Sequence, residues 1–230
     1  STGSTTSEAC DKQVRFFRKH ITTGLPFVRL KLATSLDGKI ATSRGASHWI
    51  TGAPARRLVH QWRNEMDAVM VGVGTVLADD PLLSARNRGG RDPIRVIVDS
   101  QLRTPASAAL LKKGSGRVIL VTTRAASARR EKVLSGLGAT VLRVASRSGR
   151  VDPQSLLRHL GKLDILSVLV EGGAALAGSL MRSGCVDELA LFQAPVFIGG
   201  DGKSMLGPLG IGIPAEGIRL GEHEMQLVGR

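Results

Sequence analysis

The sequence predicts one α/β domain in which a mostly parallel central sheet is covered by helices on both faces. Short apolar runs rich in Val and Ile alternate with stretches whose apolar residues recur at helical spacing. Several of these runs end in glycines, as strands that turn directly into helices commonly do. A chain of 230 residues with 42% hydrophobic and 22% charged residues is long enough, and ordinary enough in composition, to build such a core.

The individual elements follow from local patterns. Val28, Leu30 and Leu32 alternate with Arg29 and Lys31, which predicts a strand with one buried face. Apolar residues at helical spacing predict the strongest helix of the chain at 53–67. The predicted strands, in order, are 27–33, 68–74, 94–99, 118–122, 140–144, 168–170 and 189–198. The predicted helices are 9–20, 53–67, 128–137, 155–163 and a stretch beginning at residue 174.

The most informative stretch is 167–182, where a buried strand is followed by Glu171-Gly172-Gly173 and then by a helix of small and apolar residues. Glycines without a Cβ let an anion approach the backbone N–H groups at the positive end of a helix, so this unit predicts a phosphate or pyrophosphate site. A carboxylate repels such an anion, so we expect Glu171 to face a second ligand. The alternative is that the two glycines form only a tight turn.

Composition narrows the range of partners. A formal charge of +13 favours anionic partners, and both phosphorylated small molecules and nucleic acids satisfy it. The basic residues are scattered, and an aromatic content of 3% argues against a nucleic-acid platform of stacked rings. Cys10 and Cys185 lie far apart, which predicts neither a zinc site nor a disulfide framework and fits a cytoplasmic protein. With apolar runs shorter than about 18 residues, we expect no membrane partner.

Two arginines are candidates for binding a phosphate. Arg63 projects from a helix whose other face is apolar, and Arg86 follows Ser84 in a loop. Two guanidinium groups that converge on one phosphate form forked, charge-assisted hydrogen bonds. Ser47 is positioned in the sequence to add a hydroxyl to the same anion. For each arginine, a solvated side chain is the simpler alternative.

Other candidates lie where strands end. Gly72-Val73-Gly74-Thr75 begins like a dinucleotide-binding turn, although Leu77 replaces the third glycine. Asp79 and Ser100 also come after predicted strands. Each residue either contacts a ligand or only forms part of a turn. The histidines, among them His60, fit no metal or triad pattern, and no activated nucleophile is recognisable. Hydride transfer from a nicotinamide cofactor is therefore attractive, because the cofactor brings its own chemistry.

Five motifs in order resemble the reductase domain of bacterial bifunctional riboflavin-biosynthesis deaminase-reductases: Pro26–Ala41, Ser47–Thr51, Gly72–Pro81, Arg95–Ser100 and Val170–Gly173. The resemblance covers residues 25–230 and implies a dihydrofolate-reductase-like, three-layer α/β fold with a mixed sheet. It also implies a homodimer that reduces 5-amino-6-(5-phosphoribosylamino)uracil with NADPH, through hydride transfer to C1 of the ring-opened ribose imine. The residues identify no proton donor for the imine nitrogen, and water is one candidate.

The resemblance assigns site residues position by position. Those that match the family's substrate contacts are Ser47, Arg63, Leu83, Arg86 and Glu171, with Lys31 placed near a ribose hydroxyl. Those that match its cofactor contacts are Ala33, Trp49, Thr75, Asp79, Ser100 and the turn Gly173, Ala174, Ala175, Leu176, Ala177, Gly178 and Ser179. By analogy, Ser100 lies near the 2′-phosphate that distinguishes NADPH from NADH.

The resemblance stops short of the family's deaminase. The H-x-E and P-C-x-x-C signature of a zinc deaminase is missing from these 230 residues. We expect residues 1–24 to be a disordered tag and connector that follows an absent deaminase domain, and the chain to be either a reductase fragment or a stand-alone reductase. Two alternatives remain: a related oxidoreductase acting on another pyrimidine or pterin, and a basic nucleic-acid-binding domain.

Overall fold

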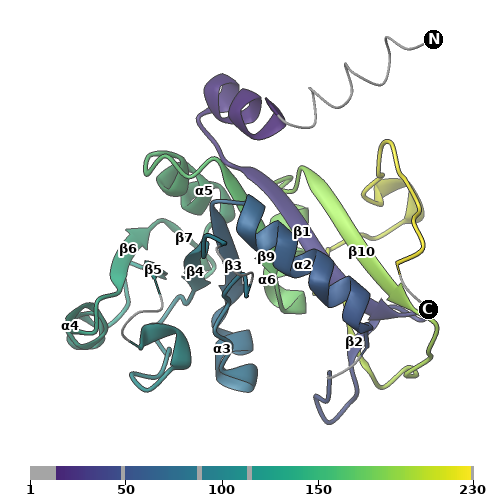
Figure 1. Ribbon diagram of the computed structural model, residues 1–230, viewed down its shortest axis with the longest axis horizontal. Helices are drawn as coiled ribbons and strands as arrows, with labels where there is room; N and C mark the ends of the chain where they lie inside the picture. The colour runs from purple at the N-terminus through teal and green to yellow at the C-terminus, as the bar shows by residue number, and fades with distance from the viewer. Residues whose placement is uncertain (1–13, 48–49, 87–89, 113–115, 229–230) are drawn as a thin grey trace.

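The computed structural model describes residues 14–47, 50–86, 90–112 and 116–228. Its centre is a seven-stranded sheet in the order β10-β1-β9-β3-β4-β5-β6, in which every neighbouring pair is parallel (Figure 1). The strands are β1 (Phe27–Ser35), β3 (Ala68–Gly72), β4 (Ile94–Val98), β5 (Val118–Thr123), β6 (Thr140–Val144), β9 (Ser167–Glu171) and β10 (Glu188–Ala194). Within the described ranges, antiparallel pairing is confined to two short ribbons, β2 (Lys39–Ala41) with β11 (Lys203–Ser204) and β7 (Ser146–Arg147) with β8 (Arg150–Val151).

Helices cover both faces of the sheet, which gives three layers. Adjacent residues of a strand point to opposite faces, so Val96 and Ile97 of β4 belong to two different core clusters. Val96 packs in the cluster that contains the apolar faces of α5 (Pro153–Gly161) and α6 (Ala174–Arg182). Ile97 packs in the cluster fed by α3 (Val73–Asp79) and α4 (Ala128–Gly136), and α2 (Ala53–Glu65) lies across β1 and β9 on that same face. The predicted three-layer α/β fold is therefore confirmed, although the described central sheet is parallel throughout and not mixed.

The elements depart from the sequence prediction in several places. The predicted strand 68–74 ends at Gly72, and the next residues form α3, because Val73 and Val76 at helical spacing both pack into the core. The predicted strand 189–198 ends at Ala194. The structure also contains the two ribbons and the short 3₁₀ turns Ala109–Leu111 and Pro214–Glu216, which were not predicted. The helix predicted at 9–20 is described only from residue 14 and continues to residue 23. Of residues 1–24, predicted to be a disordered tag and connector, residues 1–13 lie outside the described residues and residues 14–23 form a helix.

Asp37 explains why β10 stops early. Its carboxylate accepts hydrogen bonds from the backbone N–H groups of Ile198 (3.1 Å) and Gly199 (2.7 Å) and from the Ser35 hydroxyl (2.6 Å). These donors, the Ser35 hydroxyl first, lower the pKa of Asp37 to about 2. These hydrogen bonds hold the chain that follows β10 beside the carboxyl end of β1, outside the sheet.

The helix at 14–23 is docked at the opposite, amino-terminal end of β1. Arg15 forms an ion pair with Glu188 at 2.8 Å, and the rings of Phe16 and Phe27 lie 5.1 Å apart. The turn after this helix passes so close to α5 that a Cβ on Gly161 would lie 2.0 Å from the carbonyl oxygen of Gly24. Nothing larger than glycine fits between these two backbones. No helix in the described part of the chain is long and apolar enough to cross a bilayer.

This close approach predicts that Gly161→Ala destabilises the protein. Inserting a methyl group against backbone costs about 1–3 kcal/mol, which exceeds the roughly 1 kcal/mol that Ala gains over Gly in a helix. Gly136→Ala is the matched control, since Gly136 also ends a helix but a Cβ there meets nothing within 4 Å. Urea denaturation should show a loss of unfolding free energy for the first variant only; equal stability of the two variants contradicts the contact.

Candidate active site

The predicted site residues gather at the carboxyl-terminal edge of the sheet. Because all seven strands are parallel, their carboxyl ends share one edge, where open α/β sheets bind their ligands. Glu171 ends β9, Gly72 ends β3 just before Thr75, and Ser100 follows β4. Lys31 lies on β1 directly opposite Glu171 in the strand register.

A two-pronged ion pair lies at the centre of this edge. Arg63 of α2 donates from Nε to Glu171 Oε1 at 2.5 Å and from Nη2 to Oε2 at 2.8 Å. Its Nη1 donates to the Ser84 carbonyl oxygen at 3.0 Å. The two charged side chains are only 13% and 12% exposed. Arg63, which was predicted to bind a phosphate, and Glu171, which was predicted to face a second ligand, therefore bind each other. Most of the hydrogen-bonding capacity of Arg63 is already used.

Lys31 brings a second cation to Glu171. It lies on the face of β1 that also carries Arg29, whose guanidinium stacks over the Trp62 ring at 4.7 Å. The Lys31 ammonium lies 5.6 Å from the centre of the Phe192 ring. Burial lowers the pKa of Lys31, Arg63 lowers it further and Glu171 opposes the change. Lys31, Glu171 and Arg63 thus form a mostly buried group of two basic side chains and one carboxylate.

The loop that carries Arg86 is held from several sides. Leu83 is 3% exposed and packs in the core, so its side chain anchors the loop. The Ala85 N–H donates to Asp92 at 2.8 Å, and the Ser84 carbonyl accepts from Arg63. Leu83 and Arg86 both have φ of 56°, a left-handed conformation that is uncommon for side chains of this size. The result is an exposed Arg86 presented next to α2 by a firmly fixed backbone.

The glycine turn after β9 is crowded on one side by Thr75. A Cβ on Gly172 would lie 3.0 Å from the Thr75 hydroxyl oxygen and 3.6 Å from the Val71 Cβ. Gly173 then precedes α6, whose first backbone N–H groups, at Ala174 and Ala175, point out of the helix start. This turn leaves bare backbone beside a hydroxyl, an arrangement that suits a phosphate or pyrophosphate.

The later residues of the predicted cofactor turn, 176–179, are buried or half-buried in α6. Ala177 is fully buried, and Gly178 is packed against the backbone of Gly207, with its Cβ position 3.0 Å from the Gly207 nitrogen. Leu176 and Ser179 are half-buried. Backbone N–H groups at the start of α6 are therefore better placed to meet a ligand than the side chains of Ala177 or Gly178.

Ser100 and Asp99 have separate roles. Asp99 is fully buried and accepts hydrogen bonds from the Thr104 N–H at 2.7 Å and hydroxyl at 2.8 Å, which fixes the loop after β4. The Ser100 hydroxyl oxygen accepts from the Val151 N–H at 3.1 Å. Among the described residues, no acceptor is found for the proton of this hydroxyl.

The remaining predicted residues lie around this edge. Asp79 is exposed at the end of α3, whereas Asp80 caps that helix and accepts from the Ala109 N–H at 2.8 Å. Ala33 is half-buried on β1, and Ser47 lies on the loop between β2 and α2. Trp49, a predicted cofactor contact, lies outside the described residues.

His60 lies at this site, although the sequence analysis did not select it. It is one turn before Arg63 on α2 and faces Ser84, Arg86 and Glu171. Burial lowers the pKa of His60, and Arg63 and Arg86 lower it further. The spacing of three residues from Arg63 was the available signal, because residues i and i+3 share a helix face.

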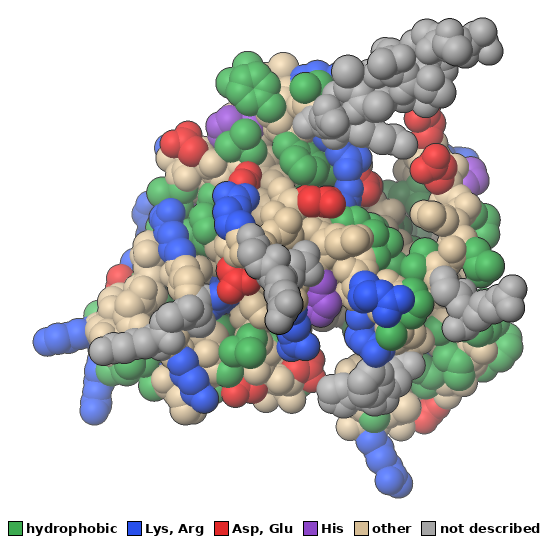
Figure 2. Space-filling view, in the orientation of Figure 1, with side chains coloured by type: hydrophobic (Ala, Val, Ile, Leu, Met, Phe, Trp, Pro, Cys, Tyr) green, Lys and Arg blue, Asp and Glu red, His purple; other side chains and the backbone are tan. Residues whose placement is uncertain are grey.

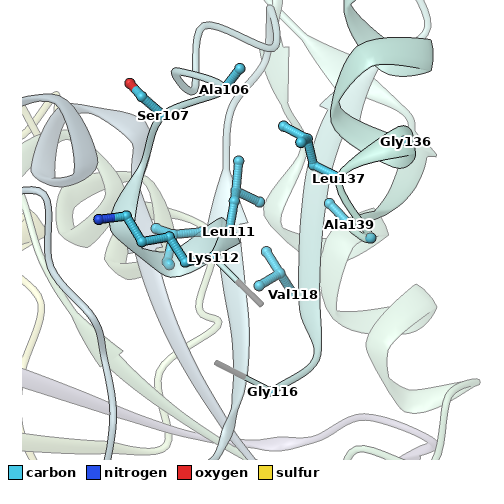
Figure 3. Close-up of a pocket in the computed structure, with 11 residues that line it drawn as sticks. Ala106, Ser107, Leu111, Lys112, Gly116, Val118, Gly136, Leu137 and Ala139 are labelled. Atoms are coloured by element: carbon cyan, nitrogen blue, oxygen red, sulfur yellow. The ribbon is translucent and has the colours of Figure 1, made fainter. Parts of the chain in front are cut away.

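Two other features lie apart from this edge. A cavity of about 840 Å³ opens where β5 begins and α4 ends, lined by apolar residues such as Leu111, Val118 and Leu137 (Figure 3). It is at the amino-terminal side of the sheet, away from Glu171. Within the described ranges, no group of three His, Cys, Asp or Glu side chains is arranged to hold a metal. Lys and Arg side chains are spread over the face in Figure 2.

Comparison with known proteins gives a consistent result. A family model described as the RibD C-terminal domain matches residues 26–228. A curated relative from Actinobacillus pleuropneumoniae, "Riboflavin biosynthesis protein RibD", is 39% identical over 96% of this chain and 59% of its own length. The chain thus spans little more than half of that protein.

Two further matches differ in extent. A Methanothermobacter thermautotrophicus protein named "2,5-diamino-6-ribosylamino-4(3H)-pyrimidinone 5′-phosphate reductase" is 39% identical over 85% of this chain and 90% of its own length. The solved structure of Acinetobacter baumannii RibD, form 1, superposes with a TM-score of 0.79 at 34% identity, covering 91% of this chain and 57% of that one.

The central ion pair predicts strong coupling between Arg63 and Glu171. Removing one partner of a buried pair leaves an uncompensated charge, so Arg63→Met and Glu171→Met should each cost about 2–4 kcal/mol of unfolding free energy. The double variant should be more stable than the sum of the two predicts by about 1–3 kcal/mol in urea denaturation. The Arg91–Asp67 pair, in which Arg91 is 64% exposed, is the control and should couple by less than about 1 kcal/mol. Additive effects at Arg63 and Glu171 contradict the pairing.

Proposed function

This chain belongs to the RibD C-terminal domain family, and on that premise we propose that it is an NADPH-dependent reductase of riboflavin biosynthesis. Its proposed reaction converts 5-amino-6-(5-phosphoribosylamino)uracil to 5-amino-6-(5-phosphoribitylamino)uracil, with hydride delivered to C1 of the ring-opened ribose imine. The observation that carries the proposal is the placement of Lys31, Glu171 and Arg63 beside the bare glycine turn. The three charged side chains suit a polar sugar, and the glycine turn suits a phosphorylated cofactor.

The glycine turn, Thr75 and Ser100 are the proposed binding groups for the cofactor. A Cβ on Gly172 would press against the Thr75 hydroxyl, so the turn is bare backbone at this point with a hydroxyl beside it. The α6 amides at Ala174 and Ala175 supply donors at the positive end of a helix. The Ser100 hydroxyl has a free proton for a ribose or its phosphate. Reduced nicotinamide, when bound, supplies the hydride.

Lys31, Glu171 and Arg86 are the proposed binding groups for the substrate. Glu171 is held rigidly by two hydrogen bonds from Arg63, so its remaining lone pairs have fixed directions toward sugar hydroxyls. Lys31 adds a donor on the opposite strand. Arg86, unlike Arg63, has no ion-pair partner among the described residues, and it takes the 5-phosphate in this proposal. Fixed groups of this kind orient the reacting carbon at little entropic cost.

A second candidate substrate differs from the first only in the pyrimidine. The archaeal relative named as a 2,5-diamino-6-ribosylamino-4(3H)-pyrimidinone 5′-phosphate reductase matches this chain over 90% of its length at 39% identity. The proposed phosphate and ribose contacts serve either compound equally. Selectivity between the two compounds has to arise at the base.

We also propose that the active form is a cytoplasmic homodimer and that residues 25–230 form its reductase domain. β10 is an edge strand whose Leu191 is 44% exposed, and Phe197 just beyond it is 74% exposed. Unpaired edges and exposed apolar side chains are the features that a partner subunit covers. Homologues of the length of the Actinobacillus protein extend beyond the matched region, and a deaminase domain is the proposed content of that extension.

Reductase activity is tested by following loss of reduced nicotinamide absorbance with each of the two pyrimidine substrates. Substrate-dependent oxidation of NADPH is expected, with oxidation of NADH slower by at least about tenfold if Ser100 contacts the 2′-phosphate. Oxidation with only the diaminopyrimidinone supports the second candidate. Binding of NADPH without turnover of either compound contradicts the proposed substrate class.

The phosphate assignment predicts a selective kinetic effect for Arg86→Ala. Losing a charge-assisted hydrogen bond costs about 1.5–3 kcal/mol, so the Michaelis constant for the phosphorylated substrate should rise by at least about tenfold. The Michaelis constant for NADPH should stay within about twofold, since the cofactor binds elsewhere at this edge. Arg91→Ala is the control, an exposed arginine on the same connection. A rise below about threefold in Arg86→Ala contradicts the assignment.

A further inference from the structure

The charge balance at the site leaves a phosphate short of cations. A phosphate monoester carries close to two negative charges at neutral pH. Arg63 is already neutralised by Glu171, with hydrogen bonds of 2.5 Å and 2.8 Å. Burial lowers the pKa of Lys31, and Lys31 is not among the charged groups that act on His60 beside Arg86. Arg86 alone therefore cannot balance a dianion placed beside it.

His60 lies where a further positive charge is needed. It is one helical turn from Arg63, and its ring faces the backbone of Ser84. Its Nδ1 is buried and has no hydrogen-bond partner among the described residues. The Ser84 carbonyl oxygen already accepts from Arg63 at 3.0 Å. His60 and Arg63, both on α2, thus converge on the backbone of Ser84, which lies two residues before Arg86 in the loop.

We propose that His60 is a positioning residue that takes up a proton when the substrate phosphate binds at Arg86. The resulting imidazolium strengthens its interaction with the Ser84 backbone, which holds the loop carrying Arg86, and it offsets the second charge of the phosphate. The proton comes from solvent, and no covalent bond changes. This inference rests on the proposed function, since it requires a phosphorylated ligand at Arg86.

The charged groups around His60 determine whether ligand binding takes up or releases a proton. The charged groups that face His60 are Arg63 on its own helix, Arg86 on the loop and Glu171 at the end of β9, with Lys31 of β1 behind Glu171. In the free protein, burial and the two arginines lower the pKa of His60, so the ring is neutral near pH 7. A bound dianion reverses this balance and raises the pKa. Ligand binding therefore takes up a proton and strengthens as pH falls through that interval.

Calorimetry with ribose 5-phosphate, a fragment of the proposed substrate, measures this directly. Titrations in two buffers of different ionisation enthalpy give the number of protons taken up per ligand bound. Near pH 7 we expect uptake of about 0.5–1 proton by the wild-type chain and close to zero by His60→Gln. The affinity of His60→Gln should be about tenfold weaker at pH 6.5 and equal to wild type at pH 8.5.

A control and a second readout separate the possible results. His159→Gln, whose ring bonds the Ser155 carbonyl on α5, should keep the wild-type proton uptake. NMR of the wild-type histidine rings should show one ring becoming protonated as ribose 5-phosphate is added at pH 7, even if His60→Gln folds poorly. Unchanged uptake in folded His60→Gln, or no ring that responds, overturns the role of His60 alone. Failure of the wild-type chain to bind ribose 5-phosphate overturns the proposed phosphate site as well.

Discussion

Parallel pairing of all seven strands is the constraint on which the arrangement of this protein depends. It places the ends of β1, β9, β3 and β4 on a single edge, although the residues there come from distant parts of the sequence. Arg63 and Glu171, for instance, are 108 positions apart and meet only because α2 crosses the sheet above the end of β9. A single shift in strand order would separate the glycine turn from the charged residues that adjoin it.

The buried ion pair at this edge does two jobs that conflict energetically. Charges removed from water are costly, and a well-packed apolar pair would often serve stability as well or better. What the pair provides instead is a carboxylate with a fixed orientation and an arginine that also holds the Ser84 carbonyl. Burying the pair costs desolvation free energy. Such a cost is expected at a site that has to hold a carboxylate in one orientation toward a polar ligand.

Some parts of this architecture could be predicted from the sequence, and others could not. The apolar runs that became β5 and β9 are recognisable because a strand buried on both faces has to be largely apolar. Helix α3 was missed because it spans only seven residues and follows a glycine, so local signals of a turn outweighed two valines. Residue types at the site were identified from motifs, and the partners of those residues were not. No local pattern reveals that Arg63 binds Glu171, or that His60 lies between two arginines.

The tight passage of Gly24 past Gly161 has a consequence for the path of the chain. It fixes the direction in which the chain enters β1, at the sheet edge opposite the Arg63–Glu171 pair. β1 is nine residues long, so the two edges are about 30 Å apart. The chain that leads into β1 through the helix at 14–23 therefore joins the domain at the end of the sheet remote from Arg63 and Glu171.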